Sequence, residues 1–193
     1  MKERPSRPST GEPSTDVLVH IVQGEHQVTV DERIVLTTTL GSCVAACIRD
    51  PFAQVGGMNH FLLPSGESVE GTSVQRFGAY SMELLINSLL RAGARRERLE
   101  AKLFGGARLS ENLPDIGAQN VAFAHQFLER ENIILQRGCV GGDHARRVQF
   151  WPVSGRVRQL ALARADNELI VRESRSRPIE LEVGRVELFK KKA

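Results

Sequence analysis

The sequence predicts an α+β domain, with a mixed β-sheet as its core and two main helices flanking it. Short β-branched and apolar runs come first, then two segments with helical periodicity separated by one strand, and then further alternating runs. A βαβ protein would alternate strands and helices regularly, so this order favours the α+β class. The length of 193 residues, of which 41% are hydrophobic, favours one domain that buries its own core.

Strands are expected where β-branched and apolar residues gather between turn residues. The run Ile34–Leu40 is the clearest, because it holds Ile, Val, Leu and three threonines in succession. Residues 44–48 are short and apolar, and periodicity leaves strand and helix equally open there. Gly24-Glu25 is expected to form a turn, and Pro152–Gly155 a hairpin. The remaining expected strands are 17–22, 27–30, 60–63, 99–103, 133–136, 147–151 and 156–162.

Two helices are expected, at 75–92 and 116–131. The first carries one apolar stripe with the i, i+3, i+4, i+7, i+8 spacing of a buried helix face, and Gly93 follows as the residue that ends it. Asp115 precedes the second helix and can cap its first turn. The stripe residues are Met82, Leu85, Ile86, Leu89 and Leu90 in the first helix and Val121, Ala124 and Leu128 in the second.

Composition divides the chain into a disordered leader (1–15), a folded domain (16–164) and a charged C-terminal extension (165–193). The first residues lack the apolar core of a signal peptide, and no run approaches the ~20 apolar residues of a membrane span. A net charge of +3 without a dense basic block argues against nucleic-acid binding. We therefore expect a cytoplasmic protein with reduced thiols and no membrane insertion.

Cys43 is the candidate nucleophile. It follows Gly41 and Ser42, two small residues that allow a tight turn and leave the thiol accessible. His60 comes after a second glycine pair, Gly56-Gly57, and precedes an apolar run. A thiol with a nearby imidazole is the arrangement of a cysteine nucleophile and its base.

The other cysteines and glycine pairs favour structural roles. Cysteine is among the most buried residue types, so Cys47 and Cys139 are interpreted as packing residues. The three cysteines lack paired CxxC spacing and no HExxH is present, so no metal or other cofactor is expected. Gly105-Gly106 and Gly141-Gly142 lack phosphate-binding spacing and favour tight turns or close approach of substrate backbone.

The stretches around Cys43 and His60 resemble the CheD family, the bacterial chemoreceptor glutamine deamidases. The resemblance extends in order over about residues 17–160. The matching segments are 36–45, 56–64, Arg76-Phe77-Gly78, 102–107, Ile116-Gly117, Asn120-Val121, Gly141-Gly142, 146–150 and 154–157.

This resemblance implies hydrolysis of selected glutamine side chains on methyl-accepting chemotaxis receptors, giving glutamate and ammonia. It places the family's catalytic residues on Cys43, His60 and Thr37, the last beside Thr38 and Thr39 of the same type. It further implies a layered sandwich related to toxin-type cysteine deamidases, hydrolysis of receptor methyl esters in some members, and in some a chemotaxis phosphatase as partner.

Backbone N–H groups around Gly41 and Ser42 are candidates for the oxyanion hole. Because the substrate is a protein, the site is expected to be an exposed cleft. Two alternatives remain open from the sequence. One is a non-catalytic module that binds a phosphatase or receptor, and the other is a thiol amidohydrolase acting on a small-molecule amide.

Overall fold

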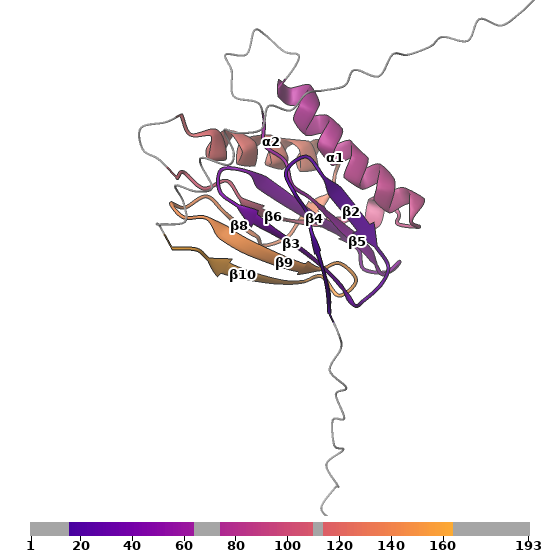
Figure 1. The fold of residues 1–193 in the computed structure, drawn as a ribbon. Helices are drawn as coiled ribbons and strands as arrows, with labels where there is room; N and C mark the ends of the chain where they lie inside the picture. The colour runs from indigo at the N-terminus through magenta and orange to yellow at the C-terminus, as the bar shows by residue number, and fades with distance from the viewer. Residues whose placement is uncertain (1–15, 64–73, 110–113, 164–193) are drawn as a thin grey trace, which may run out of the picture.

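The computed structural model describes residues 16–63, 74–109 and 114–163. The expected leader and C-terminal extension lie outside these residues. The described part of the chain forms three layers (Figure 1): an outer sheet, a central sheet, and two helices on the face of the central sheet that the outer sheet leaves free. This arrangement confirms the α+β layered sandwich. It leaves the relation to toxin deamidases a prediction.

The outer sheet has four strands in the order β1-β3-β9-β10, and the central sheet has the order β2-β5-β4-β6-β7, with β8 paired to β6. Parallel and antiparallel pairs occur in both sheets, so each is mixed. The strands are β1 (Val17–His20), β2 (His26–Thr29), β3 (Ile34–Leu40), β4 (Val44–Asp50), β5 (Val55–Asn59), β6 (Glu100–Gly105), β7 (Ile134–Leu135), β8 (Cys139–Val140), β9 (Arg146–Trp151) and β10 (Arg156–Ala161).

Both expected helices are present, as α1 (Val74–Arg91) and α2 (Ile116–Arg130). The Asp115 carboxylate accepts the Ala118 N–H at 2.9 Å, so the expected cap is confirmed. Gly93 adopts a φ of +101° just beyond α1, which is the left-handed conformation expected of a residue that ends a helix. The apolar stripes of both helices pack on the central sheet, while a second core fills the space between the sheets.

The segment 44–48, left open between strand and helix, is part of strand β4. The strand expected at 60–63 is wrong, because the strand is β5 and it ends at Asn59. Gly56 and Gly57 therefore lie within a strand and not at a corner. A Cβ on Gly56 would come 2.6 Å from the Pro152 carbonyl oxygen, and one on Gly57 would come 2.5 Å from that of Gln27. These glycines allow the β9–β10 turn and strand β2 to approach β5 closely.

The expected turn at Gly24-Glu25 does not join a hairpin. Strands β1 and β2 belong to different sheets, so residues 21–25 cross from the outer sheet to the central one. Residues Gly41–Cys43 make the same crossing between β3 and β4. The expected hairpin at Pro152–Gly155 is confirmed, since it joins the antiparallel strands β9 and β10.

Candidate active site

Three chain segments meet where the chain crosses between the two sheets. They are residues 21–25, the Gly41–Cys43 crossing, and the residues just after β5. The Gly24 N–H donates to the His60 carbonyl oxygen at 2.7 Å, and the His60 N–H donates to that of Glu25 at 3.0 Å. Backbone pairing therefore holds residues 21–25 against His60.

The pairing between Val44 and Phe61 determines the direction in which the side chains of Cys43 and His60 project. These two residues exchange N–H to C=O hydrogen bonds of 2.9 Å in both directions. Because side chains alternate along a strand, the preceding residues, Cys43 and His60, both project on the opposite face, toward the outer sheet. They occupy diagonal positions, where Cα atoms lie about 7–8 Å apart. The two expected residues therefore share one face of the central sheet.

The tautomer of His60 follows from its neighbours. The Thr38 hydroxyl donates to the Ile21 carbonyl oxygen at 2.7 Å, so its single hydrogen is used. The same oxygen lies 2.9 Å from His60 Nδ1 and so acts as the acceptor of an Nδ1–H. The other ring nitrogen, Nε2, then carries the lone pair, and it has no hydrogen-bond partner among the described residues. It is free to take a proton.

The structure places Thr38, and not the expected Thr37, against the imidazole. Adjacent residues of a strand point to opposite faces, so only one of the two hydroxyls can face the gap between the sheets. The Thr37 hydroxyl donates to the Val148 carbonyl oxygen of β9 at 3.0 Å. Thr37 acts near the site only through its backbone, where its carbonyl oxygen accepts the Ile21 N–H at 2.9 Å.

The Cys43 thiol is buried, with 5% of the residue exposed. His60 is 7% exposed, so the expected exposed cleft is wrong for the described state. Burial raises the pKa of the Cys43 thiol to about 12, although its own backbone N–H opposes this. The thiol donates to Gln23 Oε1 across 3.4 Å. The resting nucleophile is therefore a neutral thiol covered by a carboxamide.

Burial also lowers the pKa of His60 to about 4, with a smaller opposing effect from the Ile21 carbonyl. Thiol and imidazole are consequently both neutral at pH 7. A neutral pair of this kind is suited to general-base removal of the thiol proton during attack, and not to a standing ion pair.

The lowered pKa of His60 makes stability depend on pH. The unfolded chain binds a proton near pH 6.5, whereas the folded one does so only near pH 4. Stability is therefore full above pH 6.5 and falls as the pH drops, by about 2–3 kcal/mol at pH 4.5. Urea unfolding at pH 7.5 and 4.5 checks this. Between pH 7.5 and pH 4.5, the unfolding free energy of His60→Gln should fall by about 2–3 kcal/mol less than that of the wild type. An equal fall in both proteins would contradict the burial of the His60 ring.

The backbone carbonyl groups around Cys43 accept hydrogen bonds from residues that follow strand β6. The Gly41 carbonyl accepts the Ala107 N–H at 2.8 Å, and the Cys43 carbonyl accepts the Gly106 N–H at 2.7 Å. Within residues 16–63, 74–109 and 114–163, no oxygen atom accepts the N–H of Ser42 or of Cys43, and the Cys43 N–H is near only its own thiol. These two donors can serve a developing oxyanion.

Asn120 of α2 fastens the two reactive segments to each other, a role that its sequence position did not indicate. Its Nδ2 donates to the Ser42 carbonyl oxygen at 2.9 Å, and its Oδ1 accepts the Leu63 N–H at 2.8 Å. The side chain is fully buried. One carboxamide thus connects the residue before Cys43 to a residue shortly after His60.

The remaining cysteines lie outside this site. Cys47 is buried in the core between the sheets, and burial raises its pKa further than that of Cys43. Cys139 packs against the same core, and Arg146 donates to its sulfur at 3.1 Å. Among the described residues, no three His, Cys, Asp or Glu side chains gather closely enough to hold a metal ion.

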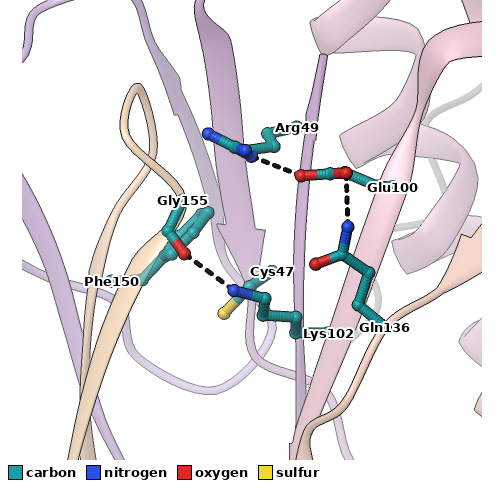
Figure 2. A pocket seen from close by; sticks show the side chains of 7 residues that line it. All are labelled: Cys47, Arg49, Glu100, Lys102, Gln136, Phe150 and Gly155. Atoms are coloured by element: carbon teal, nitrogen blue, oxygen red, sulfur yellow. Dashed lines mark hydrogen bonds and ion pairs between the residues drawn. The ribbon is translucent and has the colours of Figure 1, made fainter. Parts of the chain in front are cut away.

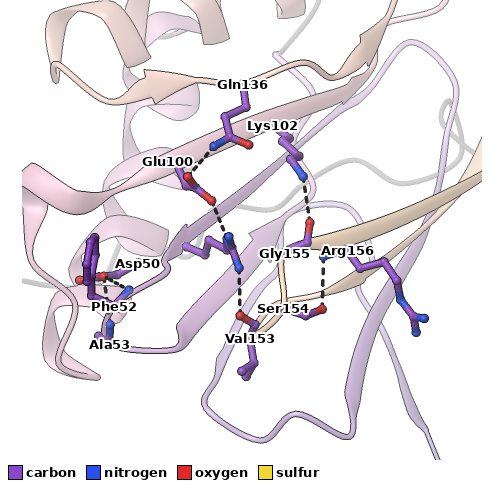
Figure 3. Close-up of polar contacts among 11 residues, drawn as sticks. Asp50, Phe52, Ala53, Glu100, Lys102, Gln136, Val153, Ser154, Gly155 and Arg156 are labelled. Atoms are coloured by element: carbon purple, nitrogen blue, oxygen red, sulfur yellow. Dashed lines mark hydrogen bonds and ion pairs between the residues drawn. The ribbon is translucent and has the colours of Figure 1, made fainter. Parts of the chain in front are cut away.

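A pocket lies at the opposite end of β4 from Cys43 (Figure 2). Within it Arg49 pairs with Glu100 at 2.6 Å, Gln136 also binds that carboxylate, and Lys102 donates to the Gly155 carbonyl oxygen at 2.9 Å. Arg49 also donates to the Val153 carbonyl oxygen at 3.0 Å. These contacts join the central sheet to the β9–β10 hairpin, whose residues Val153 and Gly155 are labelled in Figure 3. The polar groups satisfy one another, which indicates a structural tie between the sheets.

Comparison with known proteins decides the family. The family described as "CheD chemotactic sensory transduction" matches residues 62–160. A protein of Caulobacter vibrioides is 59% identical over 153 residues, which cover 79% of this chain and 82% of the relative. The chain belongs to the CheD family.

Two further sequence relatives support this assignment. One from Agrobacterium fabrum is 55% identical, with 79% of this chain and 84% of the relative covered. One from Acidiphilium cryptum is 54% identical, with 89% and 93% covered. All three are named "Probable chemoreceptor glutamine deamidase CheD". A solved structure of a Neisseria meningitidis DUF152 protein shares 11% identity at a TM-score of 0.42, with 64% and 63% of the two chains covered. In the described part of this CheD-family chain, no helix has the length and apolar character to cross a membrane.

Proposed function

We propose that this CheD-family chain is a protein-glutamine glutaminase that deamidates receptor glutamines in the cytoplasm, with Cys43 as nucleophile. The observation that carries the proposal is the site itself: a thiol and an imidazole on one strand face, with the free lone pair of the imidazole on Nε2. The names of the relatives supply the substrate class.

In the first step, His60 Nε2 takes the Cys43 proton as sulfur attacks the carboxamide carbon of the substrate glutamine. The N–H groups of Ser42 and Cys43 stabilise the oxyanion, each well-placed donor contributing about 3–4 kcal/mol. The protonated His60 then gives its proton to the leaving nitrogen, ammonia departs, and a thioester remains. Water activated by His60 hydrolyses the thioester, which yields glutamate and the free thiol.

Thr38 positions the base in this mechanism. By accepting the Nδ1–H, its hydroxyl keeps the lone pair on the nitrogen that has to take the proton. When the ring becomes protonated, the same contact stabilises the imidazolium, which otherwise forms in a buried place that disfavours charge.

Thr38→Val removes this hydroxyl and keeps the shape of the side chain. We expect a fall in kcat of about 10- to 100-fold, since a mispositioned base loses much of its contribution. Thr37→Val is the matched variant on the other face of β3, and it should keep most of the activity. Steady-state kinetics of the two variants shows which threonine orients His60. The reverse order would restore Thr37 as the orienting residue.

The deciding test of function is mass spectrometry of a receptor cytoplasmic fragment incubated with the protein. Deamidation adds about one dalton per converted glutamine, because an amide becomes an acid, the product of the thioester route. Free glutamine is offered in parallel, with ammonia release as the readout. Conversion of the fragment alone supports the proposal, whereas conversion of free glutamine alone favours a small-molecule amidohydrolase.

A non-catalytic binding module is the alternative function. It predicts binding to the receptor fragment, or to a chemotaxis phosphatase, without any mass change. The proposed partner is the cytoplasmic helical region of a methyl-accepting receptor, and a phosphatase partner and methyl-ester hydrolysis remain predictions from the family resemblance. Titration of the fragment against a catalytically inactive Cys43→Ala variant separates binding from turnover.

A further inference from the structure

Gln23 is the only polar side chain to which the described structure joins the Cys43 thiol. The thiol and Gln23 Oε1 lie 3.4 Å apart, and Gln23 itself is partly buried. The mechanism above gives this residue no role. Its side chain ends in a primary carboxamide, the same group that the proposed substrate presents.

The backbone holds Gln23 in this place. The next residue, Gly24, donates its N–H to the His60 carbonyl and has a φ of +91°, which glycine adopts readily. Glu25 closes the turn by donating its N–H to the Val22 carbonyl at 3.1 Å. The turn that carries Gln23 is therefore fastened to the residue that bears the base, and its side chain is directed at the nucleophile.

Attack requires the substrate carbonyl carbon about 3–3.5 Å from sulfur. Gln23 Oε1 accepts the S–H of Cys43 at 3.4 Å, so the Gln23 carboxamide occupies the space beside the sulfur that this carbon has to enter. Since only 5% of Cys43 is exposed, a second carboxamide has no room beside the thiol while Gln23 stays there. One of the two groups has to replace the other.

We propose that Gln23 is an internal stand-in for the substrate, and that the space its carboxamide occupies is the subsite of the receptor glutamine's carboxamide. The inference rests on the proposed function for the identity of the incoming group. Rotation of the Gln23 side chain away from Cys43 opens the subsite, while the turn remains bonded to His60. A receptor side chain then makes the contact with the thiol that Gln23 makes in the resting enzyme.

Gln23→Ala tests this by emptying the subsite. We expect the variant to alkylate at Cys43 with iodoacetamide at least about 10-fold faster than the wild type, followed by peptide mass mapping to separate Cys43 from the other cysteines. Its KM for the receptor fragment should fall while kcat stays at least at the wild-type level. Gln27→Ala is the matched control, because Gln27 is an exposed glutamine on the neighbouring strand β2.

Unchanged alkylation and unchanged KM in Gln23→Ala would overturn the proposal. So would a fall in kcat of about 100-fold with unchanged alkylation, since Gln23 would then be an oxyanion donor. A gain of about one dalton on the peptide containing Gln23, present in the wild type and absent in Cys43→Ala, would support it, because the carboxamide would have reached the position for attack.

The alkylation readout separates this inference from the proposed function. It measures access to Cys43 and needs no turnover. If Gln23→Ala alkylates faster but no receptor glutamine is converted, Gln23 occupies the space beside Cys43 and the proposed deamidase function is rejected. If receptor glutamines are converted but alkylation is unchanged, the deamidase function stands and the role of Gln23 is rejected.

Discussion

Cys43→Ala is expected to lower the rate of receptor-glutamine deamidation by about 10⁶-fold, because it removes the atom that forms the thioester. Loss of the nucleophile in an enzyme of this kind has an effect of about that size. Stability should change by less than about 1 kcal/mol, since a free cysteine packs as a small apolar residue. Mass spectrometry of the receptor fragment measures the first effect, and urea unfolding the second.

Cys47→Ala is the matched control for this variant. Cys47 lies on the same strand, β4, and in the same core between the sheets, and it is likewise buried. The substitution also removes one buried sulfur atom, and it should leave deamidation near the wild-type rate. Loss of activity in both variants would trace the effect to core packing, and substantial activity in Cys43→Ala would reject the thiol mechanism.

The elements that carry strong local signals were predictable from the sequence. Helices α1 and α2 follow from the apolar stripe and the residues that end or cap them, because both signals act over a few neighbouring residues. Cys43 and His60 were found through their motif and the family resemblance. Their meeting depends on the Val44–Phe61 pairing, which joins residues far apart in the sequence.

The misassigned features depend on tertiary contacts. Three threonines in a row give no local sign of which one faces the gap between the sheets, and a shift by one residue exchanges the faces. Gly56-Gly57 has the composition of a turn, yet Gln27 and Pro152 approach so closely that only glycine fits in the strand. Gln23 carries no local signal, and Asn120 was matched only as part of the family resemblance, because the contacts that make both residues important form only in the fold.

Gly105→Ala is expected to disturb both stability and catalysis, because Gly105 packs directly on the backbone of the nucleophile. A Cβ at this position would lie 2.2 Å from the Cys43 carbonyl oxygen. Gly105 also has a φ of +101°, which costs an L-residue about 1–2 kcal/mol. The clash adds to that strain, and we expect a total loss of about 3–4 kcal/mol of unfolding free energy.

Gly93→Ala separates the two contributions, since Gly93 also has a φ of +101° but a Cβ there meets no atom within 4 Å. It should lose only the backbone share, about 1–2 kcal/mol, and keep its activity. Relief of the clash in Gly105→Ala requires the Cys43 carbonyl to move, and with it the thiol relative to His60. Misplacement of a reacting group by 1 Å can lower a rate about 100-fold, so kcat should fall by at least that factor even below the unfolding transition. Equal stabilities and equal kcat values in the two variants would show that the contact between Gly105 and Cys43 does not hold the nucleophile in place.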